Sequence, residues 1–154
     1  GYAGAMKTWL LSWMLLCTAA CTTIAEAPLA TRAAVAPAAT DQASLQGLWL
    51  AQTESLNGRT WTVTYTYAFT GDTLAFTDET GKVVNYAFTL DPAATPKLMH
   101  LRPVEAPADE ALVPVAYAIE GDVLTIVIAP AGSRPTELSD RNDQELIVSR
   151  RKRP

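Results

Sequence analysis

The chain has 154 residues, of which 49% are hydrophobic, and it carries a formal net charge of −4 at pH 7. An acidic chain repels phosphate groups, so nucleic acid is excluded as an expected partner. When residues 1–44 are set aside for the reasons below, the rest of the chain has the length of one small domain and leaves no room for a second.

Residues 6–21 are typical of a bacterial export signal, and we interpret residues 1–5 as an upstream extension. Lys7 supplies the positive charge, and the apolar run that follows is shorter than the roughly 20 residues of a membrane-spanning helix. We therefore expect the chain to be exported, with its folded part on the periplasmic face of the cell envelope.

The signal ends in Cys17-Thr18-Ala19-Ala20-Cys21, which resembles the lipobox of bacterial lipoproteins. This resemblance implies that Cys21 is lipidated and anchors the protein to a membrane. The alternative is an ordinary signal peptide that is cut after Ala27. Both cysteines lie in this leader, so the folded domain has neither a disulfide nor a thiolate metal site.

Residues 22–44 are rich in Ala, Pro and Thr and offer almost no large apolar side chain to bury. This composition predicts a flexible tether. A tether between a lipidated cysteine and a globular domain holds the domain away from the membrane surface, which is consistent with the lipobox.

Two stretches of similar form predict β-hairpins, one around Gly71-Asp72 and the other around Gly121-Asp122. In each, glycine supplies the positive φ that a two-residue turn requires, and apolar residues flank it at matched offsets. Between Trp61 and Phe69, apolar residues alternate with Thr and Ala, which predicts one strand with a buried face. A preceding strand over 47–54 leads to a turn at Asn57-Gly58.

Similar alternation continues to the end of the domain and predicts eight strands in total. We therefore expect an all-β fold, an eight-stranded antiparallel up-and-down barrel over residues 45–151, followed by a basic tail, residues 152–154. A two-sheet sandwich is the alternative. The remaining strands are expected at 73–78, 84–90, 98–101, 113–119 and 124–128 and around Leu146 and Val148.

Six stretches occur in a characteristic order and spacing. They are Leu45 to Trp49, Phe69 to Asp72, Thr89 to Pro92 with Pro96-Lys97, Tyr117 with Gly121-Asp122-Leu124, Arg134 to Glu137, and Leu146 to Arg151. Together they resemble an uncharacterised lipocalin-like domain family that is common in planctomycete genomes. The resemblance covers nearly all of residues 45–151, departs from the family by a shortened segment between Asn57 and Trp61, and implies a calycin-like barrel without an established activity.

Gly47-Leu48-Trp49 is similar to the Gly-x-Trp at the start of lipocalins, where the tryptophan closes one end of the barrel beneath a basic residue of the last strand. Here the basic residue would be Arg150 or Arg151, and we assign Arg150 with Trp49 to barrel closure. A guanidinium over an indole contributes roughly 0.5–2 kcal/mol. This role is structural.

Four tyrosines fall on the inward register and are the candidate ligand-binding residues. Their rings point inward while their hydroxyls need partners, because a buried unsatisfied hydroxyl costs roughly 1–3 kcal/mol. Either they pack a filled core or they line a cavity. The four are Tyr65, Tyr67, Tyr86 and Tyr117.

Other polar features do not define a reaction. His100, the single histidine, alternates with Met99 and Leu101 and is expected on the outer face. The connection that contains Arg134-Pro135 either carries function or is pinned by the arginine, and the basic tail either aids solubility or touches an anionic surface. We expect no catalytic residue, no metal and no cofactor.

Two functions remain open. In the first, the protein is a lipid-anchored envelope protein, a monomer and not an enzyme, whose barrel binds a small apolar ligand. In the second, it is a ligand-free module that holds a protein or a polymer at the cell envelope. The first rests on analogy with the fold, and a packed, dry interior would favour the second.

Overall fold

The structure is a computed structural model that describes residues 37–131 and 133–154. The export signal, Cys21 and the first part of the predicted tether lie outside the described residues. Within them, no helix combines the length and the apolar character that crossing a membrane would require. The elements are α1 (Pro37–Leu45), β1 (Gly47–Leu56), β2 (Arg59–Thr62), β3 (Thr66–Thr70), β4 (Thr73–Thr77), β5 (Val83–Asp91), β6 (Leu98–Pro103), β7 (Val113–Glu120), β8 (Val123–Ile128) and β9 (Glu145–Arg151).

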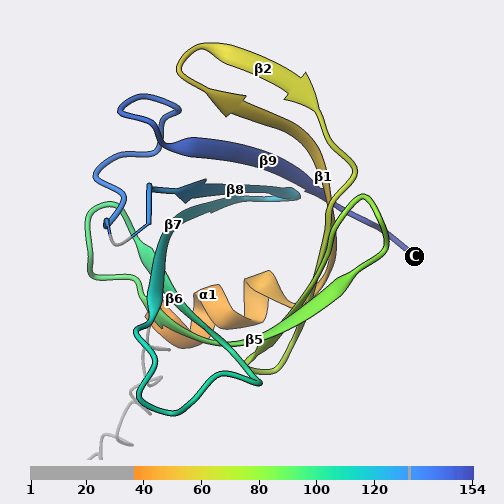
Figure 1. Ribbon diagram of the computed structural model, residues 1–154. Coiled ribbons are helices and arrows are strands. Elements are labelled where there is room, and N and C mark those ends of the chain that lie inside the picture. The colour runs from red at the N-terminus through yellow and green to blue at the C-terminus, as the bar shows by residue number, and fades with distance from the viewer. Residues whose placement is uncertain (1–36, 132) are drawn as a thin grey trace, which may run out of the picture. The chain divides into compact units, whose positions relative to one another are not determined.

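The strands form a closed antiparallel barrel (Figure 1). From β3 to β9 each strand pairs with the next one along the chain, β1 pairs with β3, and pairing of β1 with β9 closes the sheet. The predicted eight-stranded up-and-down barrel is therefore confirmed. β2 is an additional strand that pairs with β1 outside the closed ring.

The single strand predicted from Trp61 to Phe69 is wrong, because the chain is interrupted at residues 63–65 and forms β2 and β3 instead. The pairs Thr53↔Thr62 and Leu50↔Thr66 enclose two residues on β1 but three on the other segment. One extra residue is a β-bulge, which bends a strand locally. β2 pairs with β1 alone, outside the closed ring, and Trp61 on it is 40% exposed rather than buried.

Turn chemistry follows the sequence closely. Gly71 and Gly121 both have a φ of 61° and join β3 to β4 and β7 to β8, as predicted. At the tip of the β1–β2 hairpin, Asn57 and Gly58 have φ values of 49° and 80°, the two positive angles that a type I′ turn requires.

The prediction of a flexible tether is wrong for residues 37–44, because they belong to α1. Proline suits the first position of a helix, and the alanines that follow favour helix formation. Leu45, the last residue of α1, is fully buried in the core. Asp41 accepts hydrogen bonds of 2.8 Å from the Lys97 ammonium and from the Tyr117 hydroxyl, so α1 is fastened to the barrel.

One polar atom of the barrel interior lacks a partner. The Ser149 side chain is fully buried on β9, and its hydroxyl forms no hydrogen bond. Its cross-strand neighbours, Ala51 and Leu124, are apolar. A buried hydroxyl of this kind costs roughly 1–3 kcal/mol, since the water it has lost is not replaced.

We therefore predict that Ser149→Ala raises the free energy of unfolding by about 1 kcal/mol, because it removes an unsatisfied group and little volume. Urea denaturation measures this change. Ser55→Ala is the matched control: the Ser55 hydroxyl is exposed and hydrogen-bonded to Thr60, so a small loss is expected there. A lower stability of Ser149→Ala would contradict the prediction.

Candidate functional site

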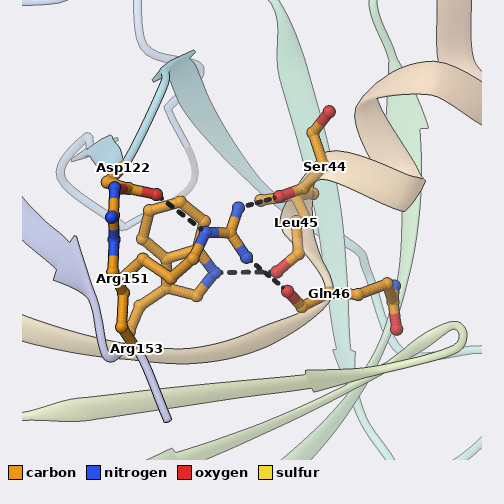
Figure 2. Close-up of polar contacts among 7 residues, drawn as sticks. Ser44, Leu45, Gln46, Asp122, Arg151 and Arg153 are labelled. Atoms are coloured by element: carbon orange, nitrogen blue, oxygen red, sulfur yellow. Dashed lines mark hydrogen bonds and ion pairs between the residues drawn. The ribbon is translucent and has the colours of Figure 1, made fainter.

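Trp49 and Arg151 meet at the end of the barrel where α1 ends, and Figure 2 shows Arg151 reaching Ser44 and Gln46 there. Its ring is fully buried, and its indole N–H donates a 2.7 Å hydrogen bond to the carbonyl of Leu45 at the end of α1. The Arg151 guanidinium lies 4.1 Å from the ring centroid and donates to the carbonyls of Gln46 (2.6 Å) and Ser44 (2.5 Å). The predicted contact between the tryptophan and a basic residue of the last strand is therefore present.

The assignment of Arg150 to this closure is wrong, because Arg151 performs it. Trp49 and Arg151 are directly paired across β1 and β9, so their side chains share the inner face, whereas Arg150 faces outward and is exposed. Asp122 supports the arrangement: it binds Arg153 and lies 3.4 Å from the Arg151 Nε (Figure 2). The hydrogen bond from Arg153 lowers the pKa of Asp122 below its usual value.

We predict that Arg151→Lys lowers the free energy of unfolding by about 2–3 kcal/mol, since an ammonium cannot stack on the indole and reach both carbonyls at once. Arg150→Lys, the same change on the neighbouring exposed residue, should stay within about 0.5 kcal/mol. Thermal and urea unfolding measure both variants. Equal effects at the two positions would contradict the role given to Arg151.

The opposite end of the barrel contains a cavity of about 320 Å³. Ligand pockets usually measure about 300–1,000 Å³, so this one suits a small molecule. The side chains that line it come from β1, β3, β4, β5, β6, β8 and β9 and from Tyr65, just before β3. The lining residues are Glu54, Tyr65, Tyr67, Leu74, Phe76, Tyr86, Leu101, Ile128, Glu145 and Ile147.

Three of the four candidate tyrosines, Tyr65, Tyr67 and Tyr86, line this cavity. The structure does not bring Tyr117 together with them. Tyr117 is buried in the core, and its hydroxyl binds Asp41 of α1. Burial, followed by that hydrogen bond, raises the pKa of Tyr117 above its usual value. Tyr117 therefore joins α1 to the barrel, while the other three line the cavity.

The cavity also contains two carboxylates that the sequence did not single out. Glu54 is only 8% exposed, and Glu145 is half-buried on the adjacent strand. Burial, followed by the charge of Glu54, raises the pKa of Glu145. Burial and a hydrogen bond to Glu54 raise the pKa of Tyr65 to about 12, so this phenol stays protonated at neutral pH and donates to the carboxylate.

The irregularity of β1 explains why Glu54 was missed. The pairing of β1 with β9 shifts between Ala51 and Thr53. Simple alternation from Trp49 would place Thr53 inside and Glu54 outside. After the shift, Glu54 pairs with Ile147 and both side chains line the cavity. No signal in the sequence marks this shift, whereas Glu145 could have been found by counting back in steps of two from Arg151.

We predict that Glu145→Gln stabilises the protein at pH 7 by less than about 1 kcal/mol, a small effect because solvent screens a half-exposed group. A carboxyl whose pKa is raised by folding favours the folded state at low pH, and this contribution is lost as the pH rises through the folded-state pKa. The advantage of the variant should therefore vanish below roughly pH 4, near the ordinary glutamate pKa. Unfolding curves at pH 3.5 and pH 7 test this, and an advantage that persists at pH 3.5 contradicts it.

Loop contacts define the rim of the open end. The connection between β8 and β9 is fastened to the β1–β2 hairpin, because the Gly58 N–H donates to the Asp140 carboxylate (2.7 Å) and the Asn57 amide donates to Asp143 (2.6 Å). Gln144, almost fully buried, accepts a 2.9 Å hydrogen bond from the Thr136 N–H. These contacts, rather than Arg134, hold the loop: Arg134 is exposed and takes part in none of the ion pairs among the described residues.

His100 lies on the outer face of β6, as expected, since Met99 and Leu101 belong to the interior cluster and His100 alternates with them. It borders an outer hollow with Asp72 and Arg102. In the part of the chain that the structure describes, no group of three or more His, Cys, Asp or Glu is placed to hold a metal ion.

In comparisons with known proteins, no family model, no curated protein and no solved structure matches this chain.

Proposed function

We propose that this protein is a non-enzymatic, lipid-anchored protein of the cell envelope whose barrel binds a small molecule with an apolar body. The single observation that carries the binding part is the cavity at the open end, which three of the four candidate tyrosines line. A core packed to the usual density of protein interiors leaves few voids larger than a water molecule. A cavity of about 320 Å³ therefore supports binding over a filled barrel.

The two ends of the barrel differ in a way that suits a binding protein. Trp49, Arg151 and α1 occupy one end, so a ligand has access from the other. The open end carries apolar side chains for a hydrocarbon body, such as Leu74 and Ile147, and a few polar groups that can fix its orientation. This combination is typical of small-molecule sites.

Export and anchoring rest on the leader. The short apolar run after Lys7 and the lipobox-like Ala19-Ala20-Cys21 favour cleavage before Cys21 and lipidation of that cysteine. A single acyl chain binds a membrane only weakly, whereas two acyl chains anchor a protein stably. A diacylated cysteine supplies two acyl chains. The resemblance to lipocalin-like domains agrees with a ligand-binding barrel, though only at the level of fold.

The second candidate, an interaction module, is favoured by exposed apolar side chains away from the cavity. Val83 and Val104 are 52% and 55% exposed and border a hollow between the start of β5 and the end of β6. Exposed apolar side chains that gather on one face mark contact surfaces in many proteins. Native mass spectrometry of the protein from its own membranes distinguishes the two candidate functions.

Native mass spectrometry of the protein, extracted gently from its own membranes, tests the proposal with two independent readouts. We expect a mass that corresponds to a chain beginning at a diacylated Cys21, and an additional small molecule released on activation. Tyr65→Ala should reduce the bound fraction about tenfold, since an aromatic wall contributes one or more kcal/mol. Tyr117→Phe is the matched control and should leave it unchanged, because Tyr117 lies outside the cavity lining.

An unmodified Cys21 in the intact protein would refute the anchor. A protein that carries no small molecule and binds neither octylammonium, 1-octanol nor octanoate would refute the binding function and favour the interaction module.

A further inference from the structure

The wall of the cavity contains aromatic rings in contact. The ring centroids of Tyr65 and Phe76 are 5.6 Å apart, and those of Tyr67 and Phe76 are 5.4 Å apart. All three side chains border the cavity. The faces of aromatic rings carry negative charge and attract cations, most strongly where water is excluded.

Glu54 adds an acidic side chain beside these rings. Its side chain is more than nine-tenths buried and lines the cavity, yet none of the ion pairs among the described residues includes it. Burial, followed by a hydrogen bond between the Tyr65 hydroxyl and Glu54, raises the pKa of Tyr65. A buried carboxylate without a cation is costly, because such a hydrogen bond does not replace its hydration.

Glu145 extends the negative charge to the adjacent strand. It belongs to the same cavity and lies two pairs along the β1–β9 ladder from Glu54, since Glu54 pairs with Ile147 and Glu145 pairs with Leu56. The cavity lining includes no Lys, Arg or His. Two acids in a hollow with low-dielectric walls concentrate a negative potential there, which attracts cations and repels anions.

We propose that the cavity selects a small organic cation, with an ammonium group held between Glu54 and Glu145 against the Tyr65 and Phe76 rings and an apolar body against Leu74 and Ile147. This inference rests on the proposed binding function and names its ligand class. It departs from the apolar ligand expected from the sequence alone. A fatty acid fits poorly, because its carboxylate would meet two others without a basic residue to compensate.

Three probes of equal length separate the head group from the hydrocarbon: octylammonium, 1-octanol and octanoate. Isothermal titration of the 154-residue chain at pH 7 should give an octylammonium affinity at least about tenfold above that of 1-octanol, with octanoate weakest. Octyltrimethylammonium should retain much of the preference, since cation–π attraction does not need an N–H donor.

Glu54→Gln and Glu145→Gln keep the shape of the side chains and remove one charge each. Each should reduce octylammonium affinity about tenfold while leaving 1-octanol affinity unchanged. Glu120→Gln, an exposed position at the far end of β7, is the matched control and should change neither. Thermal unfolding checks that all three variants fold. If one of the two cavity variants does not fold, the other still tests the proposal.

The outcomes separate the two proposals. Equal affinity for 1-octanol and octylammonium, or a preference for octanoate, would overturn the cation inference and leave the binding function intact. No binding of any probe, together with a ligand-free protein from membranes, would overturn the binding function as well. A head-group preference that survives both glutamine variants would also overturn the assignment to Glu54 and Glu145.

Discussion

The stacking of Arg151 on Trp49 is the contact on which the arrangement of the barrel depends. It joins the last residue of β9 to the beginning of β1, the two strands whose pairing closes the sheet. The same guanidinium binds the carbonyls of Ser44 and Gln46, so the end of α1 is held at the same point. Because charged hydrogen bonds to backbone carbonyls are stronger than neutral ones, a single side chain fixes both the closure and the helix.

With one end closed, the remaining interior volume lies toward the other. The buried side chains Trp49, Phe69 and Phe88 fill the barrel near α1, and Phe69 and Phe88 meet edge to face with centroids 5.4 Å apart. Tyr65, Tyr67 and Tyr86 take the equivalent inward positions nearer the open end, where hydroxyl groups meet water or a ligand. The distribution of Phe and Tyr along the strands thus matches the polarity of the two ends.

The sequence predicted the barrel because its strong local signals agree with the final fold. Positive-φ turns at Asn57-Gly58, Gly71 and Gly121 set the hairpins, and alternation set the inner faces. Choosing between Arg150 and Arg151 required the register of β9 against β1, which pattern alone does not contain. Helix α1 was missed because its residues resemble a linker in composition, whereas the burial of Leu45 and the contacts of Asp41 and Ser44 with the barrel distinguish it from one.

The alternation of residue types does not reveal the register shift in β1, and this shift is what places Glu54 in the cavity. A regular β1 would leave Glu54 in water and turn Thr53 inward, so the open end would be lined by tyrosines and aliphatic side chains with Glu145 alone. The shift between Ala51 and Thr53 and the extra residue at 63–65 on the neighbouring segment lie at the same level of the barrel. Bulges commonly redirect a side chain beside a binding site. Here the redirected side chain is a buried carboxylate, which costs folding free energy in the empty barrel and becomes favourable when a cation occupies the cavity.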